Sequence, residues 1–438
     1  MTGITDIATA DGQFRLEIGF RGVPPGAEGL TAADIARQGW TPAGGKMSLP
    51  LISVDLAQYE RNRQALFDTC VQYGCRIAPH IKTPMSPVFA KDMMAHGAWG
   101  ISTADLRQAG VMLAHGLPRV LIANQIGGKS AVRRLAALAS AHPEARIALF
   151  VDSIDFVNDL AGVWEGDASL PALDLLIEIG IGRGGVSTTS AADRLIAFIS
   201  GLEDDRIRLV GIAAYEGTAN DPDPTVFEAK MDDLFARTAD ALRRMRGAVG
   251  EGRELIVSAG GSGLFDYVIA RLVPVAQGDG NTTVLLRSGA AYFSDNGNIR
   301  DRLKAMAGRD VLNAEARARI GAAFEPALRL WAEVLTVNGD GTAICGLGLR
   351  DVAHDQGLPV PLAVWRNGEC LVSLEGNART VKLNDQHAFL DGGEAQIRTG
   401  DVIEFGIRHP CTTLDKHQLI YGVDPSHRVV AAIRTFFG

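Results

Sequence analysis

Eight short apolar runs, separated by stretches of helical periodicity, constrain the fold of this 438-residue sequence more than any other feature. Their regular alternation from residue 76 onward is typical of parallel βα units. Helical patterns at Ala131–Ser140, Ala191–Ile199 and Phe227–Met245 lie between them, at the spacing of an α/β (β/α)8 TIM-type barrel rather than of an open sheet. The predicted strands are Arg76–His80, Ala98–Ser102, Val120–Asn124, Arg146–Val151, Leu173–Ile179, Leu209–Ala214, Leu255–Ala259 and Val284–Ser288.

The pattern changes after about residue 328, where shorter strand-like segments alternate with Gly, Asn and Asp turns. This change predicts a smaller, all-β C-terminal domain. We therefore expect an N-terminal extension at 1–50, a barrel domain at 51–328 and a β-domain at 329–438, with the extension covering or extending one of the two domains. The predicted β-domain strands are Leu330–Val337, Ala343–Leu347, Thr380–Leu383, Val402–Gly406 and Gln418–Val423.

Charge and composition exclude several classes of protein. The net charge of −8 and the lack of a basic run interleaved with aromatics argue against a nucleic-acid partner. No apolar run approaches the roughly 20 residues of a membrane span, and the first twenty residues do not resemble a signal peptide. The five cysteines have no CxxC spacing, which favours a reducing compartment, so we expect a cytoplasmic enzyme.

Chemically active residue types follow the predicted barrel strands, where the active site of such a barrel lies. Lys82 stands just beyond the first strand; an isolated lysine is usually a surface charge, but one at a barrel mouth can form a Schiff base. Two glycine turns, Ser258–Gly263 and Ser288-Gly289, follow the last two strands, where phosphate sites recur in barrels. Either turn can equally be a plain strand-to-helix connection. Asn124, Asp152, Arg183 and Tyr215 follow other strands.

Arg183 stands among glycines beyond the strand Leu173–Ile179. A guanidinium that hydrogen-bonds a pyridine nitrogen keeps that nitrogen unprotonated, but an ion pair with Glu178 is an equally good interpretation. Near the C-terminus, His409 and Cys411 are expected on one side of an extended strand, a spacing that suits a divalent ion such as Zn²⁺ with open positions. His417 is expected at the surface.

Taken in order, several short motifs resemble the D-serine dehydratase and D-threonine aldolase family of pyridoxal-phosphate (PLP) enzymes, in the D-amino-acid deaminase branch of the alanine-racemase-like fold. The resemblance runs from about Leu51 to the C-terminus. In one motif, Gln386 stands before His387 where the family commonly has an acidic residue. The matching stretches are Pro79–Thr83, Glu178–Arg183 with Gly185-Val186, Ala214–Gly217, Ser258–Ser262, Arg287–Gly289, Asp385–His387 and His409–Thr413.

The resemblance implies a role for each matched residue. Lys82 would form the Schiff base with PLP, Arg183 would face the pyridine nitrogen and Tyr215 would line the cofactor. His409 and Cys411 would bind the metal, Zn²⁺ by preference, with Mn²⁺ or Co²⁺ also possible. A homodimer is also implied. The phosphate would be bound by Ser258, Gly260, Gly261, Ser288 and Gly289.

The predicted reaction is β-elimination from a D-3-hydroxy amino acid such as D-serine, giving a 2-oxo acid and ammonia. Lys82 would take the α-proton, and the metal would polarise the leaving hydroxyl. Retro-aldol cleavage competes most closely with this interpretation, although a thiolate at Cys411 favours the dehydratase branch. The sequence also leaves open a larger substrate such as D-glucosaminate and, in a different class of protein, a non-catalytic PLP carrier.

Overall fold

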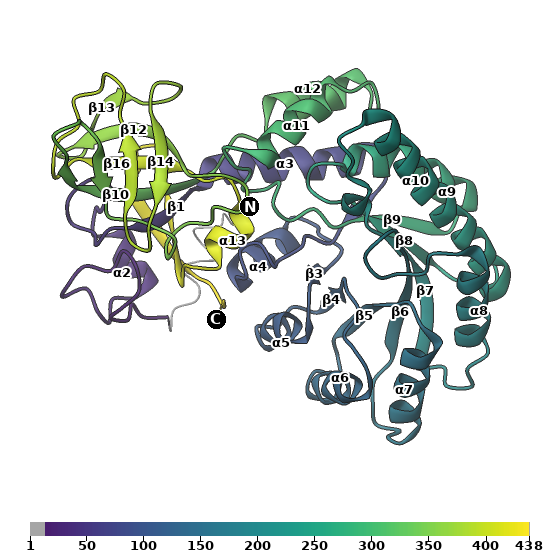
Figure 1. The fold of residues 1–438 in the computed structure, drawn as a ribbon. Coiled ribbons are helices and arrows are strands. Elements are labelled where there is room, and N and C mark those ends of the chain that lie inside the picture. Colours follow the sequence, from purple (N-terminus) through teal and green to yellow (C-terminus); the bar gives the residue numbers. More distant parts are fainter. Residues whose placement is uncertain (1–13, 438) are drawn as a thin grey trace.

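An eight-stranded parallel sheet forms the larger part of the computed structural model, which describes residues 14–437 (Figure 1). Its strand order is β2-β9-β8-β7-β6-β5-β4-β3, and a bridge between His80 and Ser102 joins the two edges. The predicted barrel is thereby confirmed. The strands are β2 (Arg76–Ile77), β3 (Ile101–Thr103), β4 (Arg119–Ile122), β5 (Arg146–Val151), β6 (Leu173–Ile179), β7 (Ile207–Ala214), β8 (Leu255–Ala259) and β9 (Thr282–Leu286).

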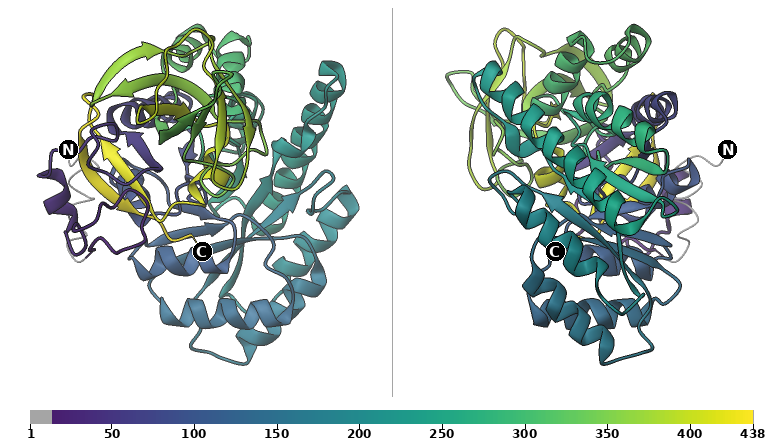
Figure 2. Two further views of the ribbon diagram at one scale, coloured as in Figure 1. Left: turned by 60° about the vertical axis from the view of Figure 1, so that its left-hand side comes forward. Right: turned by 90° about the vertical axis from the view of Figure 1, so that its right-hand side faces the viewer.

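Helices follow the barrel strands and cover the outer face of the sheet (Figures 1 and 2). Side-chain oxygens cap several of them; for example, Ser153 accepts from the Phe156 N–H and Asp223 from the Thr225 N–H. The helices are α3 (Leu56–Tyr73), α4 (Pro87–Ala95), α5 (Leu106–Ala114), α6 (Lys129–Ala141), α7 (Ile154–Glu165), α8 (Thr189–Ser200), the 3-10 helix η1 (Glu216–Ala219), α9 (Pro224–Val249), α10 (Phe265–Asp279), α11 (Asn298–Gly308) and α12 (Ala314–Ala322).

A second, mostly antiparallel sheet forms the β-domain. Its main path is β13-β12-β16-β10-β1-β17-β18, with β11, β15 and β14 branching from β10. The strands are β10 (Leu328–Val337), β11 (Ala343–Cys345), β12 (Val360–Arg366), β13 (Glu369–Ser373), β14 (Arg379–Leu383), β15 (Ala388–Asp391), β16 (Val402–Gly406), β17 (Leu419–Val423) and β18 (Val429–Arg434), with the short helix α13 (Pro410–Leu414) between β16 and β17.

The strand β1 (Leu51–Asp55) belongs to this second sheet, although the predicted boundary placed it with the barrel. It pairs antiparallel with β10 and parallel with β17. A short buried apolar run does not reveal which sheet it joins, because both sheets bury such strands on two faces. The chain therefore enters the β-domain before it forms the barrel and returns to it afterwards.

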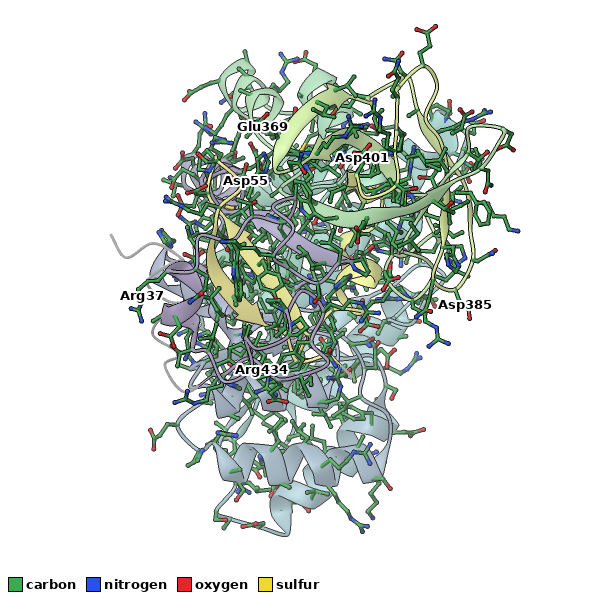
Figure 3. The ribbon with its side chains drawn as sticks, turned by 90° about the vertical axis from the view of Figure 1, so that its left-hand side faces the viewer. Arg37, Asp55, Glu369, Asp385, Asp401 and Arg434 are labelled. Atoms are coloured by element: carbon green, nitrogen blue, oxygen red, sulfur yellow. The ribbon has the colours of Figure 1, made fainter. Side chains whose placement is uncertain are left out.

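Residues 14–50, including α2 (Ala32–Ala36), pack against the β-domain. Ile35 and Trp40 join a hydrophobic cluster with Trp331 and Tyr421 of the sheet. Figure 3 looks onto this side, where Arg37, the residue after α2, lies at the margin of the molecule. The described part of the predicted extension thus covers the β-domain, whereas residues 1–13 lie outside the described residues.

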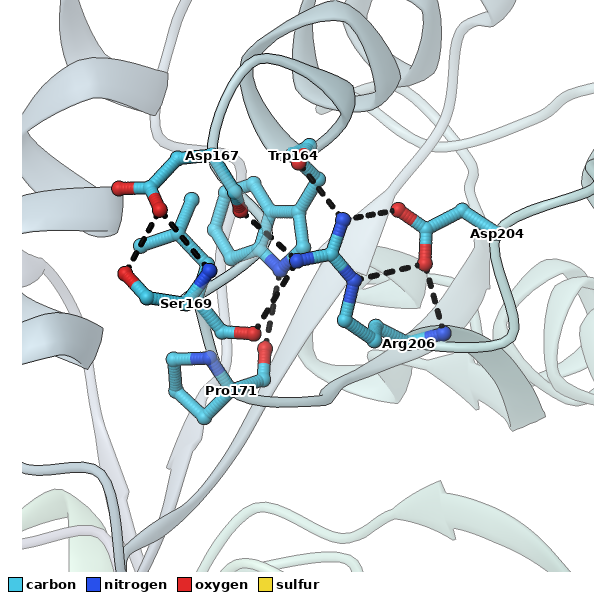
Figure 4. Close-up of polar contacts among 7 residues, drawn as sticks. Trp164, Asp167, Ser169, Pro171, Asp204 and Arg206 are labelled. Carbon is cyan, nitrogen blue, oxygen red and sulfur yellow. Dashed lines mark hydrogen bonds and ion pairs between the residues drawn. The ribbon is translucent and has the colours of Figure 1, made fainter.

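Several charged side chains at the amino ends of the barrel strands are paired with one another. Arg206, which precedes β7, donates to both carboxylate oxygens of Asp204 and to the carbonyl oxygens of Trp164 and Asp167 (Figure 4). Asp174 of β6 is fully buried and accepts from Arg146 and Arg208 at 2.5 and 2.8 Å. No helix among residues 14–437 is long and apolar enough to cross a membrane.

Candidate active site

A cavity of about 370 Å³ opens at the carboxyl ends of the barrel strands, against the β-domain. It brings together most residues that the sequence selected. Lys82, Arg183, Tyr215, Gly260, Gly261, Gly289, His409 and Cys411 all line it, although they are up to 329 positions apart in sequence. Parallel strands put their carboxyl ends on one side of a barrel, and this explains why residues that follow different strands meet there.

Lys82 follows β2 in a tight turn. The backbone N–H of Ile81 donates to the Ser102 carbonyl, and that of Met85 donates to the Ile81 carbonyl, so both sides of the lysine are anchored to the barrel. The Lys82 side chain is exposed to the cavity and forms no ion pair with a described residue. Its amine is therefore available to a ligand.

The glycine turn after β8 is bound from behind by a carboxylate. Glu216 is fully buried and accepts from the backbone N–H groups of Gly260 and Gly261. The next two N–H groups, of Ser262 and Gly263, have no acceptor among residues 14–437 and line the cavity. The turn can therefore donate to an anion through these two groups.

Ser262 also links this turn to the one after β9. Its hydroxyl oxygen accepts from the backbone N–H groups of Gly289, Ala290 and Ala291 at 2.9–3.3 Å. A Cβ at position 289 would lie 2.3 Å from the His80 carbonyl oxygen, so only glycine allows the turn to pass this close to β2. The two predicted glycine turns thus form one continuous wall of the cavity.

Two of the predicted serine side chains lie outside this wall. Ser258 is fully buried, donates to the Leu285 carbonyl and accepts from Arg287 at 2.8 Å. Ser288 is also fully buried and donates to the carbonyls of Gly260 and Gly261. Neither residue lines the cavity, and the serine that does, Ser262, lay in the predicted motif without being selected.

Arg183 is placed by a loop of glycines with positive φ at 182, 184 and 185. Asp152 anchors the loop by accepting from the Gly185 N–H at 3.0 Å. The guanidinium lies over the Tyr215 ring, 5.2 Å from its centroid. The ion pair with Glu178 does not form, because Glu178 accepts instead from the Gln125 amide at 2.6 Å.

Four positive side chains line the cavity without an ionic partner among the described residues: Lys82, Arg183, Arg287 and Arg302. Arg287, only 6% exposed, donates to Ser258 and to the Ala214 carbonyl. The two carboxylates in the wall, Glu178 and Glu216, are bound by amide donors. Two positive charges therefore remain uncompensated, and the cavity favours anions.

Burial also affects His80 in this wall. Its Nδ1 atom is buried without a hydrogen-bond partner among residues 14–437. Burial, with the charges of Lys82 and Arg287, holds the pKa of His80 well below 6.5. The imidazole is therefore neutral at pH 7.

His409 and Cys411 line the cavity at the start of the short helix α13, not on an extended strand as predicted. β16 ends at Gly406, and Pro410 begins α13, because proline has its fixed φ and missing N–H at the first helical position. His409 Nδ1 is 2.5 Å from Asp355 Oδ2, and Cys411 Sγ is 3.2 Å from Thr83 Oγ1. The pair therefore joins the β-domain to the Lys82 turn.

Hydrogen bonding shifts the pKa values of His409 and Cys411 in opposite directions. Hydrogen bonds to Cys411 and Asp355 raise the pKa of His409 to about 9. Burial raises the pKa of the Cys411 thiol, but hydrogen bonds from His409 and Thr83 outweigh it and bring the pKa below 9.0. Among residues 14–437, no three His, Cys, Asp or Glu side chains gather into a larger metal cluster.

Two other histidines of the C-terminal region, His387 and His417, lie away from the cavity. His387 is exposed beside Asp385, which Figure 3 places at the edge of the molecule. His417 is 1% exposed and contacts the Asp351 carbonyl through Nε2 at 2.8 Å, so the predicted surface position was wrong. Burial lowers its pKa to about 4. His417 lies in the short connection between α13 and β17, where no helical or strand pattern in the sequence indicates which side chains are buried.

Family comparisons agree with this two-part architecture. The family described as "Alanine racemase, N-terminal domain" matches residues 54–265, and the one described as "Putative serine dehydratase domain" matches residues 327–423. Together the two matches span most of the barrel and most of the β-domain.

Among the curated relatives, one is similar over most of the chain and another over about half of it. A 3-hydroxy-D-aspartate aldolase of Paracoccus denitrificans (strain Pd 1222) is 23% identical over 386 residues, which is 86% of this chain and 89% of the relative. A D-threo-3-hydroxyaspartate dehydratase of Delftia sp. (strain HT23) is 28% identical over 206 residues, 46% of this chain and 52% of the relative.

Solved structures share the fold. The D-threonine aldolase of Filomicrobium marinum superposes with a TM-score of 0.70 at 26% identity, covering 89% of this chain and 95% of that one. A metal-free variant of D-threo-3-hydroxyaspartate dehydratase superposes with a TM-score of 0.68 at 21% identity, covering 91% and 100%.

Proposed function

The chain belongs to the D-serine dehydratase and D-threonine aldolase-like family of PLP-dependent lyases, and we propose that it is a metal-dependent dehydratase of a D-3-hydroxy amino acid. The products would be a 2-oxo acid and ammonia. One observation carries the proposal: a free lysine, unpaired arginines and a histidine–cysteine pair meet in a single cavity.

The cavity residues fit PLP. Lys82 supplies the amine for the Schiff base, Arg183 supplies a donor for the pyridine nitrogen, and Tyr215 lies beside that arginine. The free N–H groups of Ser262 and Gly263 offer donors for the phosphate. PLP, when bound, supplies the electron sink that stabilises a carbanion at the substrate Cα.

Three residues of the cavity would have separate roles in the proposed reaction. Lys82, on one fixed side of the cavity, would accept the Cα proton only from the enantiomer that presents this proton to it, and the family resemblance indicates that this enantiomer is D. Arg183, which stays protonated, would donate to the pyridine nitrogen of PLP and so favour its unprotonated form. The neutral His80 behind Lys82 adds no further positive charge to the wall.

His409 and Cys411 fit a divalent metal, for which an imidazole and a thiolate favour Zn²⁺ over harder ions. Asp355, bonded to His409 Nδ1, leaves Nε2 of this ring to face a metal, as in other carboxylate–histidine–metal arrangements. Such a metal would act as a Lewis acid on the substrate 3-hydroxyl.

Retro-aldol cleavage is the second candidate, and it is favoured by the wide similarity to 3-hydroxy-D-aspartate aldolase. It breaks the Cα–Cβ bond and needs a base on the 3-hydroxyl. The thiol at Cys411, rather than a harder carboxylate ligand, supports dehydration. We also propose a homodimer, on the family resemblance alone.

The test is an assay of purified, PLP-loaded protein against D-serine, D-threonine, D-threo-3-hydroxyaspartate and D-glucosaminate. Ammonia and 2-oxo acid are measured in parallel with aldehyde and glycine, and L-serine is the control. We expect ammonia and 2-oxo acid in equal amounts from a D-substrate. Formation of aldehyde and glycine instead would show that the protein is an aldolase and not a dehydratase. Comparable turnover of L- and D-serine would refute the preference for D-amino acids.

A further inference from the structure

Arg302 is one of two unpaired cations of the cavity, with Arg287, that no part of the proposed reaction uses. It lies on α11, and its aliphatic stem runs along the glycine turn after β8. A Cβ at position 263 would lie 2.7 Å from Arg302 Cδ, so Gly263 leaves the space through which the side chain reaches the cavity.

Only neutral oxygens bind its guanidinium. Nε donates to Asn298 Oδ1 at 2.9 Å, and Nη2 donates to Asn220 Oδ1 at 3.2 Å. These bonds fix the plane of the guanidinium without neutralising its charge, and Nη1 has no acceptor among residues 14–437. A held, uncompensated guanidinium is suited to bidentate binding of a carboxylate.

Asn298 connects this arginine to the proposed metal ligand. Its Nδ2 donates to Gln356 Oε1 at 3.1 Å, and Gln356 Nε2 is 3.3 Å from His409 Nδ1. All these residues line the same cavity. One edge of the cavity is therefore a continuous polar arc from Arg302 to the residue beside which the substrate 3-hydroxyl would bind.

We propose that Arg302, oriented by Asn220 and Asn298, binds an anionic group attached beyond Cβ of the substrate. The inference rests on the proposed function and deepens it: the preferred substrate is a D-3-hydroxy amino acid with a second carboxylate. A substrate with a neutral hydroxylated tail, such as D-glucosaminate, leaves the Arg302 charge uncompensated.

The other cations are less suited to this role. Lys82 and Arg183 face the cofactor in the proposed reaction. Arg287 is buried and directs two guanidinium nitrogens to Ser258 and the Ala214 carbonyl. The remaining rival is that Arg302 binds the phosphate of PLP, since its stem lies on the glycine turn.

The test titrates the PLP-loaded protein with D-aspartate and D-alanine, which lack the 3-hydroxyl, and follows the cofactor absorbance. Wild-type protein should bind D-aspartate more tightly. Arg302→Gln should weaken D-aspartate binding by about 10- to 150-fold, the range for a lost charged hydrogen bond, with D-alanine binding unchanged. Arg302→Lys should keep part of the preference.

Lys304→Gln is the matched control, because it removes one positive charge from an exposed site on the same helix. It should leave both affinities unchanged. Equal losses for both ligands would overturn the proposal, and a loss of PLP affinity with an unchanged preference would assign Arg302 to the cofactor phosphate. Since this readout needs no turnover, inactivity toward every D-3-hydroxy amino acid would refute the proposed function alone.

Discussion

At the two ends of the barrel, the following positive side chains differ in whether a carboxylate pairs with them. At the amino ends of the strands, Arg146 and Arg208 share the buried Asp174, and Arg206 is bound by Asp204 (Figure 4). At the carboxyl ends, Lys82, Arg183, Arg287 and Arg302 line one cavity without an ionic partner among the described residues.

This difference indicates that the charges at one end of the barrel contribute to stability and those at the other end to ligand binding. A paired charge at a strand end fixes the loop that it contacts, whereas unpaired charges gathered in one cavity repel one another and lower stability until an anion binds. The amino end is therefore structural, and the carboxyl end is built for an anionic ligand. The β-domain adds His409 and Cys411 to the second end only.

The largest effect is expected from Lys82→Ala at the carboxyl end. Loss of both the Schiff-base amine and the proton acceptor should lower kcat by about 10⁴-fold, in steady-state assays with the best D-substrate. Lys91→Ala, at an exposed site on α4, is the control and should keep wild-type kcat. Wild-type activity in Lys82→Ala would remove this lysine from the mechanism.

Next in size is the contribution of the β-domain to the same end. Cys411→Ala should lower kcat by about 10³-fold, since a Lewis acid supplies several kcal/mol, while the cofactor absorbance stays. Cys411→Asp keeps a ligand but hardens it, so we expect metal preference to move toward Mn²⁺ and some aldehyde to form. Elemental analysis and product assays measure both changes. An unaltered kcat in metal-free Cys411→Ala would contradict the metal assignment.

At the amino end the effect should be on stability alone. Arg206→Ala removes the bonds to Asp204 and to three carbonyl oxygens, and we expect urea unfolding to show a loss of about 2 kcal/mol. The exposed Arg243→Ala should change stability by less than about 0.5 kcal/mol. Turnover per folded molecule should not change. A drop in kcat would contradict the purely structural role of the amino end of the barrel.

The smallest effect concerns acid stability of the cofactor-free protein. The pKa of His80 lies well below 6.5 in the folded state, so the unfolded state binds the proton more tightly. The stability gained from neutral His80 is complete above about pH 6.5 and declines as the pH falls below it. His80→Gln should therefore lose less stability than wild type between about pH 7.5 and 5.5 in urea titrations. Parallel losses would show that folding does not lower the pKa of His80.

The sequence predicts the barrel well because its strands are local and buried on both faces. β5, β6 and β8 have the predicted bounds. β2 is shorter than predicted because Pro79 has no N–H to donate, and beyond it His80 forms only a single bridge, to Ser102 of β3. The membership of β1 in the other sheet depends on pairing with β10 and β17, hundreds of residues away.

Site residues were predictable where they follow a barrel strand directly. Lys82 and Arg183 satisfy that rule and line the cavity. Arg302 and Gln356 do not, since one lies within a helix and the other in a β-domain loop, and only tertiary packing brings them to the cavity. Asp355 was missed for the same reason: its contact with His409 spans 54 positions.

Borohydride reduction of the PLP-loaded protein, followed by mapping of the labelled peptide, tests the active-site assignment most directly. If the unpaired cations at the carboxyl end mark the cofactor site, the label should lie on Lys82, and excess phosphate should slow its incorporation. Label on any other lysine, or none at all, would contradict the assignment of this end of the barrel as the active site.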